Sequence, residues 1–159
     1  MLTIRALRPE DLPSLLEIER ASSAAAHWRK REYQNLLASD STPLRKAFVA
    51  EKDGHTVGFV IAKAVANDWE IENVIVRAGS QRQGIGERLL SHMIQEAKSS
   101  DAQRILLEVR SQNAAAKRLY AKCGFCVVGG RRAYYRDPND DAVLYKLDLS
   151  KREGSICDQ

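Results

Sequence analysis

Cysteine is scarce in this chain of 159 residues, and long apolar runs are absent. The three cysteines, Cys123, Cys126 and Cys157, are odd in number and badly spaced for a disulfide framework, so we expect reduced thiols in a cytoplasmic protein. The C-x-x-C pair formed by Cys123 and Cys126 has no second pair of ligands nearby, and no metal site is expected. No run approaches the roughly 20 apolar residues of a membrane span, and residues 1–5 lack the apolar core of a signal peptide.

The composition is that of an ordinary globular protein, with 44% apolar and 29% charged residues. The length fits one domain, which we place at residues 1–149, followed by a tail at 150–159. Residues 77–136 carry twelve Lys and Arg against four Asp and Glu. An anionic ligand is therefore expected in this basic part of the chain. Aromatic residues are not interleaved with the basic ones, so a polyphosphate cofactor is favoured over nucleic acid, and no nucleic-acid or membrane partner is expected.

Hydrophobic periodicity predicts an α/β (α+β) fold in the order β-α-α-β-β-β-α-β-α-β-β. Asp53-Gly54 separates two apolar runs and predicts a hairpin. The strand-helix-strand unit at 70–109 should be parallel and right-handed, and the hairpins at either end antiparallel. The result is a mixed, mostly antiparallel sheet with helices on both faces. Strands are expected at 2–6, 47–50, 57–61, 69–76, 105–109, 125–129 and 142–149, and helices after Pro9 and at 29–38, 86–99 and 113–122.

A glycine-rich segment, Gln81-Arg82-Gln83-Gly84-Ile85-Gly86, lies between an apolar strand and an amphipathic helix. Glycines let a backbone approach an anion closely, and the free amides of a helix N-terminus point at it. The Gly-Lys-Ser/Thr element of a nucleoside-triphosphate loop is missing, and Leu89 stands where a dinucleotide fingerprint has its third glycine. On the residues alone, a plain strand-to-helix turn remains an alternative to an anion site.

Val74-Ile75-Val76 followed by this glycine segment resembles the Q/R-x-x-G-x-G/A signature of the GNAT superfamily of acetyl-CoA-dependent N-acetyltransferases. The order of elements is also similar to that fold over nearly the whole chain. The stretch Leu107-Glu108-Val109-Arg110-Ser111-Gln112-Asn113 is similar to a segment of the ribosomal-protein-alanine and related N-terminal acetyltransferases. Further similar segments are Leu119-Tyr120, Cys123-Gly124-Phe125 and Arg131-Arg132-Ala133-Tyr134-Tyr135.

The resemblance implies that acetyl-CoA binds between two splayed strands. Val74 and Val76 would bond the pantetheine arm through their backbones, with Ile75 between them. Asn113 would contact the cofactor beyond the second strand. The residues implied to hold the pyrophosphate are Arg82, Gln83, Gly84, Ile85, Gly86 and Glu87.

The resemblance also implies that Glu108 is the general base and Tyr120 the general acid. An amine that attacks a thioester must lose a proton, and the departing thiolate benefits from a donor. On the residues alone, a salt bridge of Glu108 to a neighbouring strand or to Arg110 is favoured over a catalytic role, and so is a core position for Tyr120. The motif match reverses both preferences. Glu70 is a competing base, because it matches the position of the catalytic glutamate in histone-type members. Glu72 shares the face of Glu70, and either could bind the substrate ammonium instead.

The expected acceptor is the N-terminal α-amine of a protein, most simply a ribosomal protein. An α-amine has a pKa of about 7.7–8.0 against about 10.4 for lysine, so one modest base suffices. The resemblance implies that Tyr134 and Tyr135 wall the peptide groove, and that His27 and Trp28 stand beside it. Two alternatives remain at this point: a GNAT enzyme for small amines or lysine side chains, and a nucleotide- or acyl-CoA-binding module without catalysis.

Overall fold

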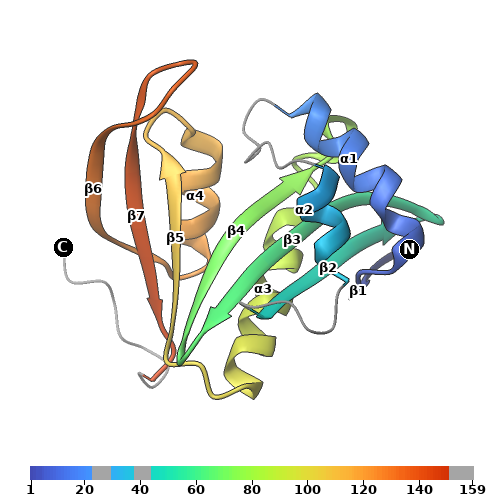
Figure 1. Cartoon of the computed structure of the whole chain (residues 1–159), viewed down its shortest axis with the longest axis horizontal. Helices are drawn as coiled ribbons and strands as arrows, with labels where there is room; N and C mark the ends of the chain where they lie inside the picture. Colours follow the sequence, from blue (N-terminus) through green and yellow to red (C-terminus); the bar gives the residue numbers. More distant parts are fainter. Residues whose placement is uncertain (23–29, 38–43, 151–159) are drawn as a thin grey trace.

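Within the described residues, 1–22, 30–37 and 44–150, the computed structural model contains a seven-stranded mixed sheet flanked by helices (Figure 1). The predicted order of helices and strands is confirmed. Two short 3₁₀ turns, η1 and η2, add to it. The elements are β1 (Leu2–Ala6), η1 (Pro9–Asp11), α1 (Leu12–Ala21), α2 (Lys30–Asn35), β2 (Leu44–Lys52), β3 (His55–Val65), β4 (Asp68–Val76), η2 (Ala78–Ser80), α3 (Ile85–Ser99), β5 (Arg104–Arg110), α4 (Ala114–Lys122), β6 (Cys126–Tyr135) and β7 (Asp140–Asp148).

The sheet order is β1-β2-β3-β4-β5-β7-β6, and β4–β5 is the one parallel pair among the described strands. The β2–β3 hairpin turns at Asp53 and Gly54, whose φ angles of 51° and 81° are those of the expected tight turn. Helix α3 crosses from β4 to β5, as the strand-helix-strand pattern predicted. The predicted mixed, mostly antiparallel sheet is confirmed.

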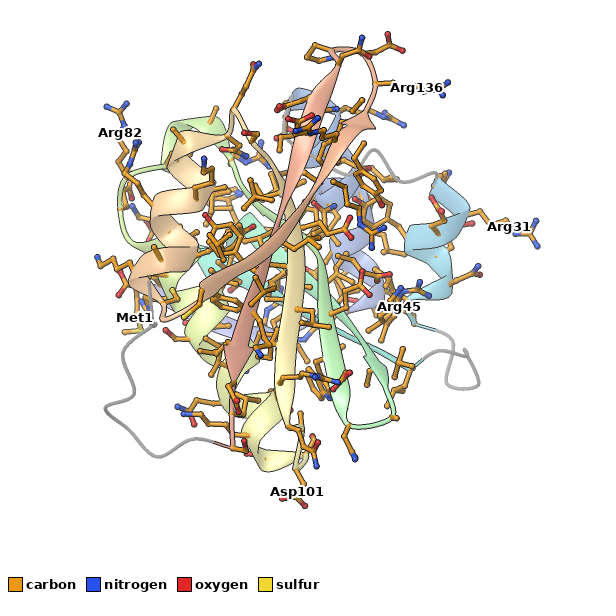
Figure 2. All side chains as sticks on the ribbon, turned by 90° about the vertical axis from the view of Figure 1, so that its left-hand side faces the viewer. Met1, Arg31, Arg45, Arg82, Asp101 and Arg136 are labelled. Carbon is orange, nitrogen blue, oxygen red and sulfur yellow. The ribbon has the colours of Figure 1, made fainter. Side chains whose placement is uncertain are left out.

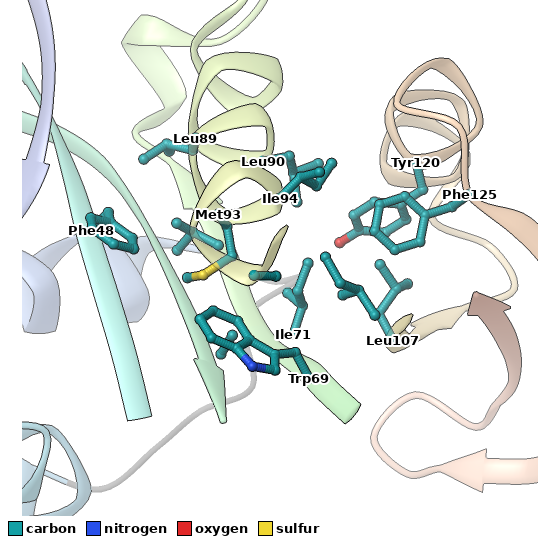
Figure 3. Packing of buried hydrophobic residues seen from close by; sticks show 14 of the residues in the cluster. Phe48, Trp69, Ile71, Leu89, Leu90, Met93, Ile94, Leu107, Tyr120 and Phe125 are labelled. Carbon is teal, nitrogen blue, oxygen red and sulfur yellow. The ribbon is translucent and has the colours of Figure 1, made fainter. Parts of the chain in front are cut away.

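Helices cover both faces of the sheet, and each face has its own core (Figure 1). Helix α3 buries Leu89, Leu90 and Met93, the face that its periodicity predicted, and these residues pack with Trp69 and Ile71 of β4 (Figure 3). On the other face, α1 and α2 cover a smaller core, whose members include Leu15, Ile18, Tyr33, Phe59 and Ile75. The sheet therefore carries one helical layer on each face.

Two expectations from the sequence need correction, and a third concerns residues that lie outside the described ranges. Strand β6 runs from Cys126 to Tyr135, well beyond the expected end at 129, because pairing with β7 carries a glycine- and arginine-rich segment that has little strand character of its own. Cys123 is a free thiol, but Cys126 is disulfide-bonded, so the expectation of reduced thiols is wrong there. His27 and Trp28 lie outside the described residues. None of the helices in the described ranges combines the length and the apolar character needed to cross a membrane.

A buried ion pair fixes the start of the chain to the sheet. The Asp11 carboxylate is 4% exposed and accepts two hydrogen bonds of 2.8 Å from the Arg5 guanidinium and one of 2.7 Å from the Arg8 amide. Arg5 also pairs with Glu51 of β2 at 2.8 Å. The hydrogen bonds from Arg5 lower the pKa of Asp11 below its usual value. The pair thus joins β1, the start of α1 and β2.

Asp11→Asn should reduce the free energy of unfolding at pH 7 by about 1–3 kcal/mol, the usual cost of losing a hydrogen bond to a buried charge. Because the pKa of Asp11 is lowered in the folded state, its contribution is present above the unfolded pKa of about 3.9 and is lost as the pH falls through the folded value. Urea unfolding at pH 7 and pH 3 measures this: the two proteins should differ less at pH 3. An equal difference at both pH values would contradict the linkage, and Asp101→Asn, at an exposed carboxylate, is the control.

Candidate active site

The two parallel strands part halfway along their length. They pair from Asp68 opposite Arg104 as far as Ile71 opposite Leu107, and no pair follows among the described residues. Beyond that point β4 stays with β3, and β5 stays with β7. A cleft of about 390 Å³ opens between them. It is lined by Ile71, Glu72, Asn73, Val74, Leu107, Glu108, Val109, Arg110, Asn113, Ala116, Tyr120, Tyr134, Tyr135 and Arg136.

A β-bulge in β4 lies where the strands part. Ile71 pairs with Ala62 and Asn73 pairs with Ile61, so Glu72 is the extra residue. A bulge bends its strand and increases the local twist. It also reverses the alternation of side chains: Ile71 packs on the α3 side, but Ile75 lies in the core beneath α1. The bulge therefore turns Val74, which packs on the α3 side, toward the cleft.

Backbone groups of both strands point into the opening. The Arg77 amide donates to the Val57 carbonyl of β3 at 2.7 Å, so the alternate residues Val74 and Val76 present their amides and carbonyls to the other side. The Val76 carbonyl indeed accepts from the Gln81 side chain at 3.2 Å rather than from β3. Ile75 turns its backbone toward β3 and its side chain into the core, so it offers the cleft no group.

Strand β5 shows the same alternation. The Ser111 amide donates to the Asp141 carbonyl of β7 at 2.8 Å, which leaves the backbone groups of Glu108 and Arg110 facing β4. Both edges of the cleft therefore offer donors and acceptors that an extended amide-containing molecule can satisfy.

The glycine-rich segment forms the N-terminus of α3. Gly84 is the N-cap residue with φ of 76°, and Arg82 also has a positive φ, 62°. The first helical hydrogen bond is that of the Arg88 amide to the Gly84 carbonyl, at 3.1 Å. The amides from Gly84 to Glu87 have no acceptor within the described part of the chain. Four donors and the positive end of the helix dipole thus converge at one place, as anion binding requires.

The two glycines of this segment have different reasons to be glycine. A Cβ at Gly84 would meet no chain atom within 4 Å, so its backbone angle and the open space beside it are the constraints. A Cβ at Gly86 would approach Leu119 of α4 to 3.1 Å, so this glycine allows α3 and α4 to pack closely. Figure 2 shows Arg82 on the side of the sheet away from Arg31 and Arg45.

Tyr120 reaches the cleft from α4. Asn113 caps that helix by accepting the Ala116 amide at 3.1 Å, and Asn113 also lines the cleft. The Tyr120 side chain is 8% exposed, with its ring 5.9 Å from the rings of Phe125 and Tyr145 (Figure 3). Burial raises the pKa of Tyr120 well above its usual value. The phenol therefore holds its proton at neutral pH and is available as a donor.

Glu108 lines the same cleft from the opposite face of β5. Its neighbours Leu107 and Val109 are buried on the α3 side, so the Glu108 carboxylate points to the side of α1 and α2. Arg131 of β6 pairs with it at 3.2 Å. A hydrogen bond to the Glu108 carboxylate raises the pKa of Tyr134. The hairpin of β6 and β7 therefore covers the carboxylate in this structure.

Tyr135 lies beside this cluster. Burial, followed by the nearby Glu108 charge, raises the pKa of Tyr135 to about 12. The Arg110 guanidinium lies 4.4 Å from the centre of the Tyr135 ring and donates to the Pro138 and Arg136 carbonyls, which fixes the hairpin end. The two expected tyrosines are thus both beside Glu108.

The other two acidic candidates are placed differently. Glu70 lies opposite Leu106, where the strands still pair, and its carboxylate is 3.3 Å from Lys63; it does not line the cleft. Glu72 lines the cleft, but its two oxygens accept from Arg45 at 2.8 and 3.1 Å.

Sequence reasoning missed Asn73, which lines the cleft, and Arg131, which contacts Glu108 from outside the lining. Asn73 is buried and donates to the Tyr33 hydroxyl of α2 at 3.2 Å. Arg131, part of a recognised segment, was given no role, although it contacts Glu108. The bulge at Glu72, which places Asn73, has no sequence signal, and the Arg131 contact depends on how far β6 extends.

The parting strands and the glycine-rich helix start have the arrangement of an N-acetyltransferase. The chain belongs to the acetyltransferase (GNAT) family, whose sequence profile matches residues 10–125. Among its relatives, the ribosomal protein bS18-alanine N-acetyltransferase of Escherichia coli (strain K12) is 34% identical over 152 residues, which cover 94% of this chain and 99% of that protein.

A Bacillus subtilis (strain 168) protein carries a provisional name for the same activity. It is 36% identical over 148 residues, which cover 93% of this chain and 96% of that protein. The crystal structure of the ribosomal-protein-S18-alanine N-acetyltransferase from Escherichia coli aligns with a TM-score of 0.82 at 31% identity, over 98% of this chain and 99% of that one. The expected GNAT fold is thereby confirmed.

Proposed function

We propose that this protein transfers the acetyl group of acetyl-CoA to the N-terminal α-amine of a ribosomal protein, with bS18 as the first candidate acceptor. Relatives at 34% and 36% identity over nearly their whole length carry that activity in their names. We assign the catalytic domain to residues 1–149, and a ribosomal acceptor favours a cytoplasmic enzyme. The observation that carries the proposal is the cleft between the parted strands, which both Glu108 and Tyr120 line.

The residues present fit acetyl-CoA. The unpaired amides at the start of α3 suit its pyrophosphate, with Arg82 adding charge. The amides of the pantetheine arm match the backbone groups that Val74 and Val76 turn toward the cleft, where the arm would replace the Gln81 side chain at the Val76 carbonyl. Asn113 at the start of α4 lines the far side of the cleft. Acetyl-CoA would thus lie along the side of the opening that faces α3 and α4.

The acceptor would enter from the other side. Glu108 faces the layer of α1 and α2, so an amine held by its carboxylate is on that side of the parted strands. The amine nitrogen attacks the acetyl carbonyl, and its proton passes to Glu108. The carbon–sulfur bond breaks, and the thiolate takes a proton from Tyr120. Because the cleft passes through the sheet, groups from both faces can act on one reacting carbon.

Glu108 is supported as the base over Glu70 by position. Glu108 lines the cleft, whereas Glu70 lies in the paired part of β4 with its carboxylate beside Lys63. Glu72, bound to Arg45, is better suited to the wall of the acceptor site than to proton transfer. Tyr134 and Tyr135 form the opposite wall.

Gly84→Val should weaken acetyl-CoA binding by roughly tenfold or more, a loss of about 1.4 kcal/mol. A branched side chain is strained at the positive φ of Gly84 and would project into the space left for the phosphates. Isothermal calorimetry measures the affinity, and Gly79→Val, at a glycine with open space and no positive φ, is the matched control. An unchanged affinity in a folded Gly84→Val protein would refute this phosphate site.

Glu108→Gln should lower kcat by about a hundred- to ten-thousand-fold, the usual contribution of a general base, with little change in acetyl-CoA affinity. Tyr120→Phe keeps the buried ring and removes only the hydroxyl group with its proton, so it should lower kcat without loss of stability. Steady-state kinetics and calorimetry separate the two effects. Glu70→Gln is the matched control, and near-full activity of Glu108→Gln together with inactivity of Glu70→Gln would move the base to Glu70.

The acetyl group should appear on the α-amine of an alanine-initiated peptide that also contains lysine. At neutral pH about a tenth of α-amines are uncharged, against under about one in a thousand lysines. Mass spectrometry locates the acetyl group. Blocking the N-terminus while leaving the lysine free should stop the reaction; acetylation of that blocked peptide on lysine would instead favour a lysine acetyltransferase.

A further inference from the structure

The carboxylate proposed as the base is already paired with a cation of the protein itself. The Arg131 Nε lies 3.2 Å from the Glu108 Oε1, and the Arg131 guanidinium lies 5.6 Å from the centre of the Tyr134 ring. The nearby Arg110 is engaged elsewhere, by two carbonyls of the hairpin and the Tyr135 ring. Arg131 is therefore the cation that neutralises Glu108 among the described residues.

At neutral pH most of the acceptor α-amine arrives as an ammonium ion, which is drawn to the same carboxylate and loses one proton to water before the neutral amine attacks. Two cations that contact one carboxylate repel each other, so each weakens the binding of the other. The side chain of Arg131 is 56% exposed, and it extends from β6, the last strand of the sheet, so it can swing into solvent at small cost. The Glu108 side chain is only 25% exposed and stays in the cleft.

We propose that Arg131 is the resting counter-ion of Glu108, which an acceptor ammonium must displace before transfer. This inference rests on the proposed function and identifies a residue that controls access to its base. While paired, Glu108 is not free to take a proton from water. Arg131 thus limits the side reaction in which water attacks the acetyl carbonyl, Glu108 accepts the water proton, and the thiolate leaves with the proton of Tyr120.

Arg131→Gln should therefore lower the KM for the acceptor and raise the rate of acetyl-CoA hydrolysis. The KM for an alanine-initiated peptide should fall roughly two- to fivefold, the range expected when an exposed ion pair no longer competes. Hydrolysis of acetyl-CoA in the absence of acceptor, followed by thiol release, should rise by a similar factor. Acetyl-CoA affinity should not change, which also shows that the variant is folded. The Arg131→Lys variant keeps the charge and should behave as the wild type in both measurements.

Arg132→Gln is the matched control, since it removes the adjacent arginine of the same strand. A purely structural role for Arg131 predicts the opposite result, a higher KM and no added hydrolysis, and would overturn the proposal. In the Glu108→Gln background, Arg131→Gln should have no effect on hydrolysis. If Glu108→Gln is inactive but Arg131→Gln behaves as wild type, only this inference fails; if Glu108→Gln is fully active, the proposed base fails as well.

Discussion

The parting of β4 and β5 after Ile71 and Leu107 is the constraint on which the site depends. Two neighbouring strands normally satisfy each other's amides and carbonyls, and leaving them apart costs hydrogen bonds. Here β4 stays paired with β3 and β5 stays paired with β7, so each strand loses hydrogen bonds along only one edge. The bulge at Glu72 bends β4 at the same point. The unpaired edges are then free for a ligand that carries amides of its own.

A gap within a sheet, unlike a pocket on its surface, joins two faces. Tyr120 approaches from the α3 and α4 layer, where burial keeps its phenol protonated, and Glu108 approaches from the layer of α1 and α2. The proposed acid and base thereby lie on opposite sides of one opening. The glycine-rich start of α3 lies on the side proposed for acetyl-CoA, and the hairpin of β6 and β7 closes the side proposed for the acceptor. The pairing of Arg131 with Glu108 follows from that closure.

Short-range sequence patterns were enough to predict the order of the helices and strands. The Asp53-Gly54 turn, the apolar stripe of α3 and the glycines before it each depend on residues a few positions apart, and the structure confirms all three. Strand β6 was predicted too short, because its second half is held by β7 and not by its own composition. The disulfide at Cys126 was likewise not foreseen.

The sequence by itself determined the order of elements, the parallel unit and the family, since motif spacing and periodicity are properties of short segments. It also brought Glu108 and Tyr120 forward as candidates. Only the tertiary structure decided which acids reach the cleft, because one extra residue at Glu72 reverses the alternation of β4 and the end of strand pairing leaves Glu70 outside. It alone placed Arg131 on Glu108, since that contact joins β6 to β5 across β7, and no local pattern encodes a distance between residues on strands that are not adjacent.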